Sequence, residues 1–219
     1  ALGGGQAPPA AFLPRQHPHY AADAVEYPFN AQQGRQLLSA RGWADTDGDG
    51  LVDKDGQALA LSLAGGGAQA ALLAAIQDQL RANCGIAVQS RVLTRSELEG
   101  DWPEGVIFGR RFDLAVFAWQ IGMAPACQLF TSGQIAGPDN PAGANDTGYS
   151  SAEFDAACRP TMLADDMAEA QRIFARDLPA LPLFFQPQVA ATRPGLEGYA
   201  LDPSAESELW NIEEIRLTR

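Results

Sequence analysis

Phe108-Gly-Arg-Arg-Phe-Asp-Leu-Ala-Val-Phe-Ala-Trp119 is a charged turn followed by an apolar run that ends in a tryptophan. The run at 114–118 has no polar alternation, which is typical of a strand buried on both faces. It is therefore expected in the middle of an α/β sheet. Because ligands of open α/β sheets bind beyond the carboxyl ends of the strands, Trp119 is a candidate ligand residue.

Two more strands and two helices are predicted before this stretch. Residues 59–63 alternate between leucine and smaller side chains, and 86–92 is a second strand-like segment. A helical pattern at 68–82 lies between them, so the three elements predict a βαβ unit with parallel strands. A shorter helix is expected at 31–40, since Asn30 begins a capping-box-like start.

A long polar loop and two helices are predicted after the stretch. Residues 123–150 are rich in Gly, Pro, Asn and Ser, and a connection of this length is expected to be functional or braced. Helical patterns follow at 151–163 and 166–178. Residues 181–186 predict a strand whose proline places it near an edge. The chain is thus assigned to the α/β class, with a mixed sheet flanked by helices.

Composition excludes several classes of protein. The formal net charge of −12 argues against a nucleic-acid partner, whose binding surface needs clustered Lys and Arg. No apolar stretch approaches the ~18 residues that a membrane span needs. Hydrophobic residues make up 46% of the chain, which predicts a packed core rather than disorder. Residues 1–20 begin with a Gly/Ala/Pro-rich lead and are expected to be a linker between lobes.

The aspartates at 45–53 form the sharpest local motif. They match positions one, three, five and nine of a calcium loop, with Gly50 at the sharp turn. Gly56 stands where that loop needs a bidentate glutamate, so repeated Asp-Gly turns of a hairpin are the alternative. A calcium-binding structural or adhesion module is therefore the second function considered. Its ligands would be Asp45, Asp47, Asp49 and Asp53.

No catalytic group is assigned. His17 and His19 have no third metal ligand near them in sequence, and they offer no Ser-His-Asp or Cys-His arrangement. The glycines at 65–67 lack the following Lys-Ser/Thr pair of a P-loop. The chain is expected not to be an enzyme and to need no cofactor. A hydrolase is the third class, and turnover of an ester or peptide panel would reveal it.

Several motifs in a fixed order resemble extracellular solute-binding proteins of the peptide/nickel-binding family, which deliver ligands to ABC importers. The similarity includes the strand that ends at Trp119 and a helix that ends in Gly85-Ile-Ala-Val88. The other matching motifs are Tyr27-Pro-Phe-Asn30, Gly34-Arg-Gln-Leu-Leu38, Arg41-Gly-Trp43, Asp47-Gly-Asp-Gly50, Asn145-Asp-Thr-Gly-Tyr-Ser-Ser-Ala-Glu-Phe-Asp155 and the segment 179–183.

The resemblance implies a periplasmic-binding-protein-like lobe of type II. Family members are longer and close two lobes around a ligand, so residues 21–192 are expected to form the second lobe. Residues 193–219 are expected to return toward the first lobe, outside this chain. The resemblance further implies capture of a small solute or oligopeptide without chemistry, and an ABC permease as partner. It implies an extracellular or periplasmic parent protein, held at the membrane only by a lipid anchor outside this sequence.

The resemblance also suggests which residues meet the ligand. Trp119, Gln120, Asn145 and Tyr149 are expected to line the face that closes on the other lobe. Peptide binders of the family carry an aspartate three residues after the tryptophan, where it pairs with the peptide amine. Here that position is Gly122, which speaks against a plain oligopeptide ligand unless another acid compensates.

Three cysteines leave one thiol over, and spacing alone does not choose the pair. Cys127 begins the long polar loop and Cys158 lies on the helix that ends it, so a disulfide between them would brace the loop. The exported parent implied by the resemblance provides an oxidising compartment. Cys84 is expected to be a free, small apolar side chain. The alternative is three free thiols.

Overall fold

The computed structural model describes residues 8–119, 126–159, 164–185, 190–202, 207 and 209–218, without the side chains of 164–166. The chain divides into two compact units. Unit 1 contains Ala1–Glu26, Gln120–Thr131 and Ser151–Arg219, and unit 2 contains Tyr27–Trp119 and Ser132–Ser150. Within the described ranges, no helix is both long enough and apolar enough to span a membrane.

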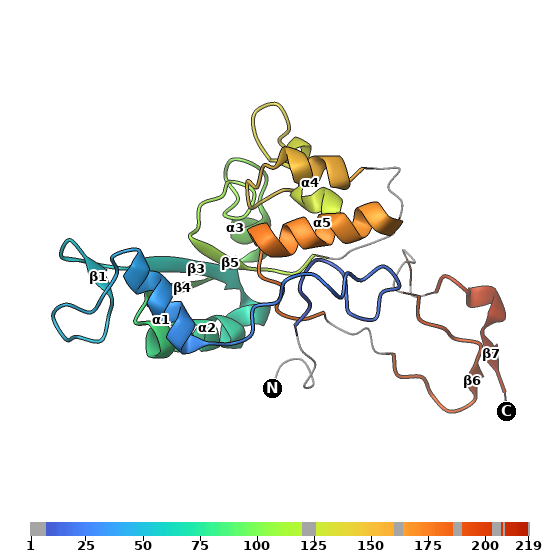
Figure 1. Ribbon diagram of the computed structural model, residues 1–219. Helices are drawn as coiled ribbons and strands as arrows, with labels where there is room; N and C mark the ends of the chain where they lie inside the picture. Colours follow the sequence, from blue (N-terminus) through green and yellow to red (C-terminus); the bar gives the residue numbers. More distant parts are fainter. Residues whose placement is uncertain are drawn as a thin grey trace. The chain divides into compact units, whose positions relative to one another are not determined.

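Unit 2 is built on a three-stranded parallel sheet in the order β4-β3-β5 (Figure 1). Its strands are β3 (Ala60–Gly66), β4 (Ala87–Leu93) and β5 (Leu114–Val116), and α2 (Ala70–Cys84) connects β3 to β4. The predicted βαβ unit is therefore confirmed. The helix ends at Gly85, whose φ of 67° is the left-handed conformation that a glycine adopts readily.

The prediction that the apolar run at 114–118 forms the middle strand is wrong. The middle strand is β3, and β5 pairs with β3 alone among the described strands. Side chains of the β5 region are covered by packing rather than by a second neighbouring strand. They pack against a cluster formed by Ala64, Leu98, Val106 and Ile107, to which Phe112, Ala115 and Phe117 add partly buried side chains.

The helix α2 lies very close to the carboxyl end of β3. A Cβ atom added at Gly65 would lie 2.9 Å from Cδ2 of Leu73 and 3.2 Å from the carbonyl oxygen of Val116. Leu73 is 1% exposed, so its side chain has little room to move. Gly65 is thus required by the contact between helix and sheet.

Replacing Gly65 with alanine is expected to lower the free energy of unfolding by about 1–3 kcal/mol, because overpacking displaces Leu73 or the β5 backbone. Gly67→Ala is the matched control, since nothing lies within 4 Å of the added Cβ there. Urea unfolding of both variants measures the difference. Equal stability of the two variants would contradict the tight helix–sheet contact.

The N-terminal part of unit 2 forms a helix and a small hairpin. The predicted helix is α1 (Ala31–Ala40), and the Asn30 side chain caps it by accepting a hydrogen bond from the Gln33 N–H. The helix α1 contacts α2, where a Cβ added at Gly34 would lie 3.3 Å from Sγ of Cys84. The remaining elements are β1 (Asp53–Lys54), β2 (Gln57–Ala58), η1 (Gly67–Gln69), α3 (Arg95–Glu99) and η3 (Ser132–Gln134).

Unit 1 has an aromatic core, with α4 (Ala152–Ala157) and α5 (Ala164–Asp177) in contact (Figure 1). The ring of Phe174 meets those of Phe12 and Phe130 edge-on, at centroid distances of 5.5 and 4.8 Å. Residues 11–13 are buried in this unit, although 1–20 was expected to be a linker. The short Ala11-Phe12-Leu13 run shows no periodicity from which a core role could be predicted.

A disulfide joins Cys127 to Cys158 in unit 1, across 31 residues, and Cys84 is a free thiol. This is the pairing that the positions of the three cysteines and the resemblance predicted. Cys127 belongs to η2 (Ala126–Phe130), and Cys158 caps α4. Both residues are buried, so the bridge forms part of the packed interior of the unit.

The strand predicted at 181–186 is not formed in its described part, 181–185. No described strand pairs with it, and an extended segment becomes a strand only where a neighbour accepts and donates its hydrogen bonds. Leu181 and Phe184 are exposed. The tail instead forms β6 (Leu196–Glu197), η4 (Ile212–Glu214) and β7 (Arg216–Leu217), with β6 and β7 antiparallel.

Candidate functional site

Trp119 lies just beyond the carboxyl end of β5 and is half-buried. Its ring meets the rings of Phe117 and Phe108 edge-on, with centroid distances of 5.6 and 6.2 Å. The indole Nε1–H is buried and has no hydrogen-bond partner among the described residues. A buried N–H without an acceptor is costly, so this edge of the sheet is suited to a ligand that brings one.

The segment 145–149 is a loop held by its own side chains. Asn145 is fully buried, and its amide donates to the carbonyl oxygen of Tyr149 at 2.8 Å. The Thr147 hydroxyl donates to Oδ1 of Asn145 and accepts from the backbone N–H of Tyr149. Asn145 thus shapes the loop from inside, whereas Tyr149 is half-buried.

One turn contacts both predicted ligand segments. Phe108 lies against Trp119, and two residues later the side chain of Arg110 passes over Gly148. The Cδ of Arg110 would lie 3.1 Å from a Cβ at Gly148, and its Nη1 donates to the carbonyl oxygen of Ala136 at 2.9 Å. Trp119 and the loop 145–149 therefore belong to one connected region of unit 2. Gln120 and Gly122 lie outside the described residues.

Asp146 is the residue of this region that the sequence did not suggest. It is 1% exposed, and neither carboxylate oxygen has a hydrogen-bond partner among the described residues. Burial raises the pKa of Asp146 to about 7, against smaller lowering effects of nearby backbone N–H groups and of the Arg110 charge. An aspartate in a polar loop is ordinarily exposed, so its residue type carried no signal of this burial.

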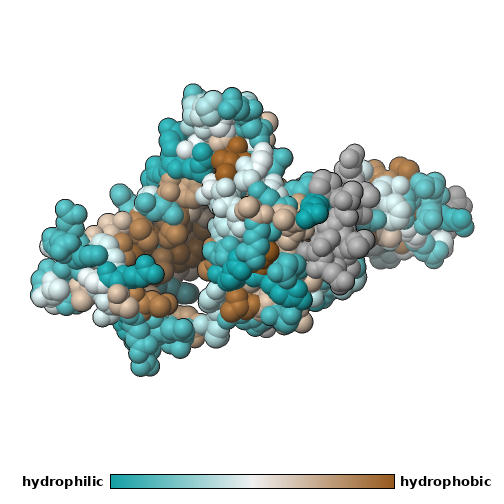
Figure 2. Space-filling model, turned by 45° about the horizontal axis from the view of Figure 1, so that its top comes forward, coloured by the Kyte–Doolittle hydropathy of each residue, from teal (hydrophilic) through white to brown (hydrophobic). Residues whose placement is uncertain are grey.

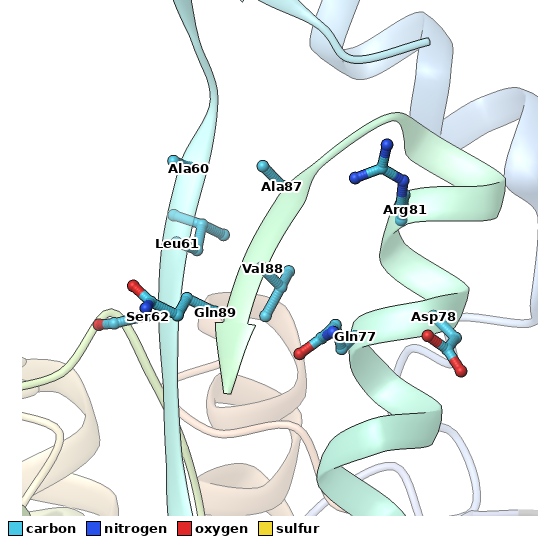
Figure 3. Close-up of a pocket in the computed structure, with 9 residues that line it drawn as sticks. All are labelled: Ala60, Leu61, Ser62, Gln77, Asp78, Arg81, Ala87, Val88 and Gln89. Atoms are coloured by element: carbon cyan, nitrogen blue, oxygen red, sulfur yellow. The ribbon is translucent and has the colours of Figure 1, made fainter. Parts of the chain in front are cut away.

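A separate hollow of about 330 Å³ lies beside α2 (Figure 3). Its strand residues come from the amino ends of β3 and β4, so it lies at the opposite end of the strands from Trp119. Ligands of open α/β sheets bind at the carboxyl ends, which favours the Trp119 region as the site. The lining residues are Ala60, Leu61, Ser62, Gln77, Asp78, Arg81, Ala87, Val88 and Gln89.

The aspartate-rich loop holds itself by hydrogen bonds to its own backbone. Asp45 accepts from the N–H groups of Gly48 and Gly50, and Asp53 accepts from the N–H and hydroxyl of Thr46. Oxygens of Asp45, Asp47 and Asp49 lie within 4.8 Å of one another, and all three residues are exposed. These contacts are those of a turn-rich hairpin connection, and calcium binding stays an untested prediction.

Large apolar side chains also reach the surface, where Figure 2 shows brown patches. In unit 2, Phe29 is 79% exposed. In unit 1, Leu181, Phe184 and Trp210 are among the exposed side chains, in two segments that follow α5. Exposed apolar segments of this kind are typical of surfaces that another part of a protein covers.

Comparison with known sequences gives two matches. A profile described as bacterial extracellular solute-binding proteins, family 5 Middle, matches residues 1–140. The chain is 28% identical, over 213 residues, to the oligopeptide-binding protein AppA of Bacillus subtilis (strain 168). This match covers 90% of the chain and 36% of AppA, so the chain spans about a third of the length of this relative.

Comparison with solved structures shows the same fold. AppA from Bacillus subtilis in complex with a nonapeptide superposes with a TM-score of 0.72 and 23% identity, covering 97% of this chain and 43% of that one. The oligopeptide-binding protein of Thermus thermophilus with a pentapeptide gives 0.75, 21%, 90% and 36%. NikZ from Campylobacter jejuni in complex with Ni(L-His) gives 0.66, 14%, 90% and 41%.

Proposed function

The chain belongs to the bacterial extracellular solute-binding proteins of family 5, and from this we propose that it is part of a receptor that captures an oligopeptide or similar small solute for an ABC permease. The observation that carries the proposal is the sequence match to AppA along 90% of the chain. The position of Trp119 beyond the carboxyl end of β5 supports it, because that edge is where such sheets bind ligands.

We assign the ligand-facing role to Trp119, Gln120 and Tyr149, with Asn145 holding the loop from within. The half-buried indole offers an apolar face and an N–H donor without a partner in the described region. A peptide group, which has carbonyl acceptors and apolar side chains, matches both features. Peptides are bound by AppA and by the Thermus protein in their solved complexes, which supports this ligand class.

The complete receptor is proposed to close a second lobe over this face. The exposed apolar residues at 181–185 and 209–217 support a cover from chain outside this sequence, toward which the tail 193–219 returns. Capture then requires both walls, so this chain alone is expected to fold but to bind weakly. The receptor would act in the periplasm or outside the cell, anchored through lipid, and would not alter its ligand chemically. The disulfide supports an oxidising compartment.

In the complete receptor, Trp119→Ala is expected to weaken ligand binding by about 2 kcal/mol or more, roughly thirtyfold in Kd, since an aromatic residue buried by a ligand dominates binding. Native mass spectrometry of the purified receptor identifies the co-purified solute, and calorimetry then measures its Kd. Trp210→Ala, at an exposed tryptophan outside the site, is the control. A receptor that retains no solute and binds no member of a peptide panel would overturn the proposed function.

A further inference from the structure

We propose that Asp146 is a proton-operated switch, which keeps the loop 145–149 packed when its carboxyl group is protonated and loosens the loop when it ionises. The proposal goes beyond ligand capture, because it concerns the conformation of the loop itself. It rests on the enclosure of the carboxyl group, on the contacts that brace the loop around it, and on the position of the nearest cationic side chain.

The loop encloses Asp146 on both sides along the chain. Before it, the Asn145 N–H donates to the carbonyl oxygen of Gln134 at 2.7 Å, and the Asn145 side chain reaches over to Tyr149. After it, the Thr147 hydroxyl joins Asn145 to the Tyr149 N–H. These bonds hold Asp146 in the interior, so its carboxyl group cannot reach water unless some of them break.

The described surroundings suit a neutral carboxyl group rather than a carboxylate. Neither oxygen of Asp146 accepts a hydrogen bond there, and an ionised carboxylate that is buried without partners is strongly disfavoured. The same burial raises the pKa of Asp146 to about 7 from its usual value of 3.8. Its proton is therefore exchanged near neutral pH, where an ordinary aspartate is fully ionised.

Arg110 is the charged side chain that acts on Asp146 among the described residues. It forms no ion pair with Asp146 there, is exposed, and donates through Nη1 to the carbonyl oxygen of Ala136. Arg110 also has a φ of 50°, a left-handed conformation that is uncommon outside glycine. When Asp146 ionises, the packed loop can relieve the buried charge by opening to water or by drawing the Arg110 guanidinium away from Ala136.

Either response disturbs the contacts that carry Tyr149. Opening breaks the Asn145–Tyr149 bond, and movement of Arg110 removes the side chain that covers Gly148. The sign follows from proton linkage. Because the packed loop holds a proton that the open loop loses, packing is favoured at acidic pH and is progressively lost as the pH rises through about 7.

The test is hydrogen exchange of the loop amides of the full chain at pH 5 and pH 8, corrected for intrinsic exchange rates. Linkage of one proton allows up to a tenfold change per pH unit below the raised pKa. Protection of the Tyr149 N–H is therefore expected to fall by about a hundredfold between these pH values. In Asp146→Asn, which keeps the shape and removes the charge, protection is expected to change less than about threefold.

Asp139→Asn is the matched control, since Asp139 is exposed in the same unit. It should retain the pH dependence of the unchanged protein. Equal protection at pH 5 and pH 8 in the unchanged protein would overturn the proposal, as would a pH dependence that Asp146→Asn leaves intact. If Asp146→Asn does not fold, carbon-13 NMR of the unchanged protein decides the matter: titration of the Asp146 carboxyl near its usual value of 3.8 rather than near 7 excludes the switch.

Discussion

Replacing Phe174 with alanine is expected to lower the free energy of unfolding of unit 1 by about 3–5 kcal/mol. Phe174 is 1% exposed, and its ring joins the rings of Phe12 and Phe130 in one aromatic core. Removal of the ring leaves a cavity that the N-terminal segment and η2 cannot both move to fill. Urea unfolding followed by far-UV circular dichroism measures the loss.

Phe184→Ala provides the matched control, because Phe184 is 41% exposed in the same unit. Its loss is expected to change stability by no more than about 0.5 kcal/mol in this chain. A similar effect of the two substitutions would mean that Phe174 does not organise the core of unit 1. Phe12→Ala should behave like Phe174→Ala if residues 11–13 belong to that core.

Removing the disulfide by a double substitution, Cys127→Ala with Cys158→Ala, is expected to destabilise unit 1 by about 3–4 kcal/mol. The bridge closes a loop of 31 residues, and the chain-entropy model relates loop length to the freedom that the unfolded chain regains. Both cysteines are buried, so their removal also loosens packing. Thermal unfolding of the oxidised protein and of the double variant measures the difference.

The control for this experiment is Cys84→Ala, which removes a thiol without opening a bridge. We expect it to cost below about 1 kcal/mol, as for a small apolar side chain that is half-buried. Reduction with dithiothreitol should reproduce the double variant and leave the double variant itself unchanged. Three alkylatable thiols in the native oxidised protein would refute the bridge.

The sequence predicts the local elements of this fold better than their neighbours in space. The hydrophobic periods place α2 and the strands on either side of it, and Asn30 and Gly85 mark helix ends through capping rules. The order of the strands was misjudged, because a continuous apolar run reports coverage and not pairing. For β5, part of that coverage comes from Leu98, Val106 and Ile107, which lie on another segment.

The candidate site follows the same division. Trp119 could be found because a tryptophan at the end of a strand has a predictable place in an α/β sheet. Asn145 and Tyr149 could be found because they belong to a motif. Asp146 could not, since its burial depends on hydrogen bonds among Gln134, Asn145 and Thr147 that no spacing rule encodes.

Cys84 gives this protein a chemical handle of its own. The sequence has three cysteines, and the bridge uses the other two, so a maleimide dye can label the oxidised protein at a single position. Because the thiol is half-buried where α1 approaches through Gly34, its alkylation rate reports how often the two helices separate. A spin label or fluorophore attached there would follow motion of unit 2 without any engineered residue.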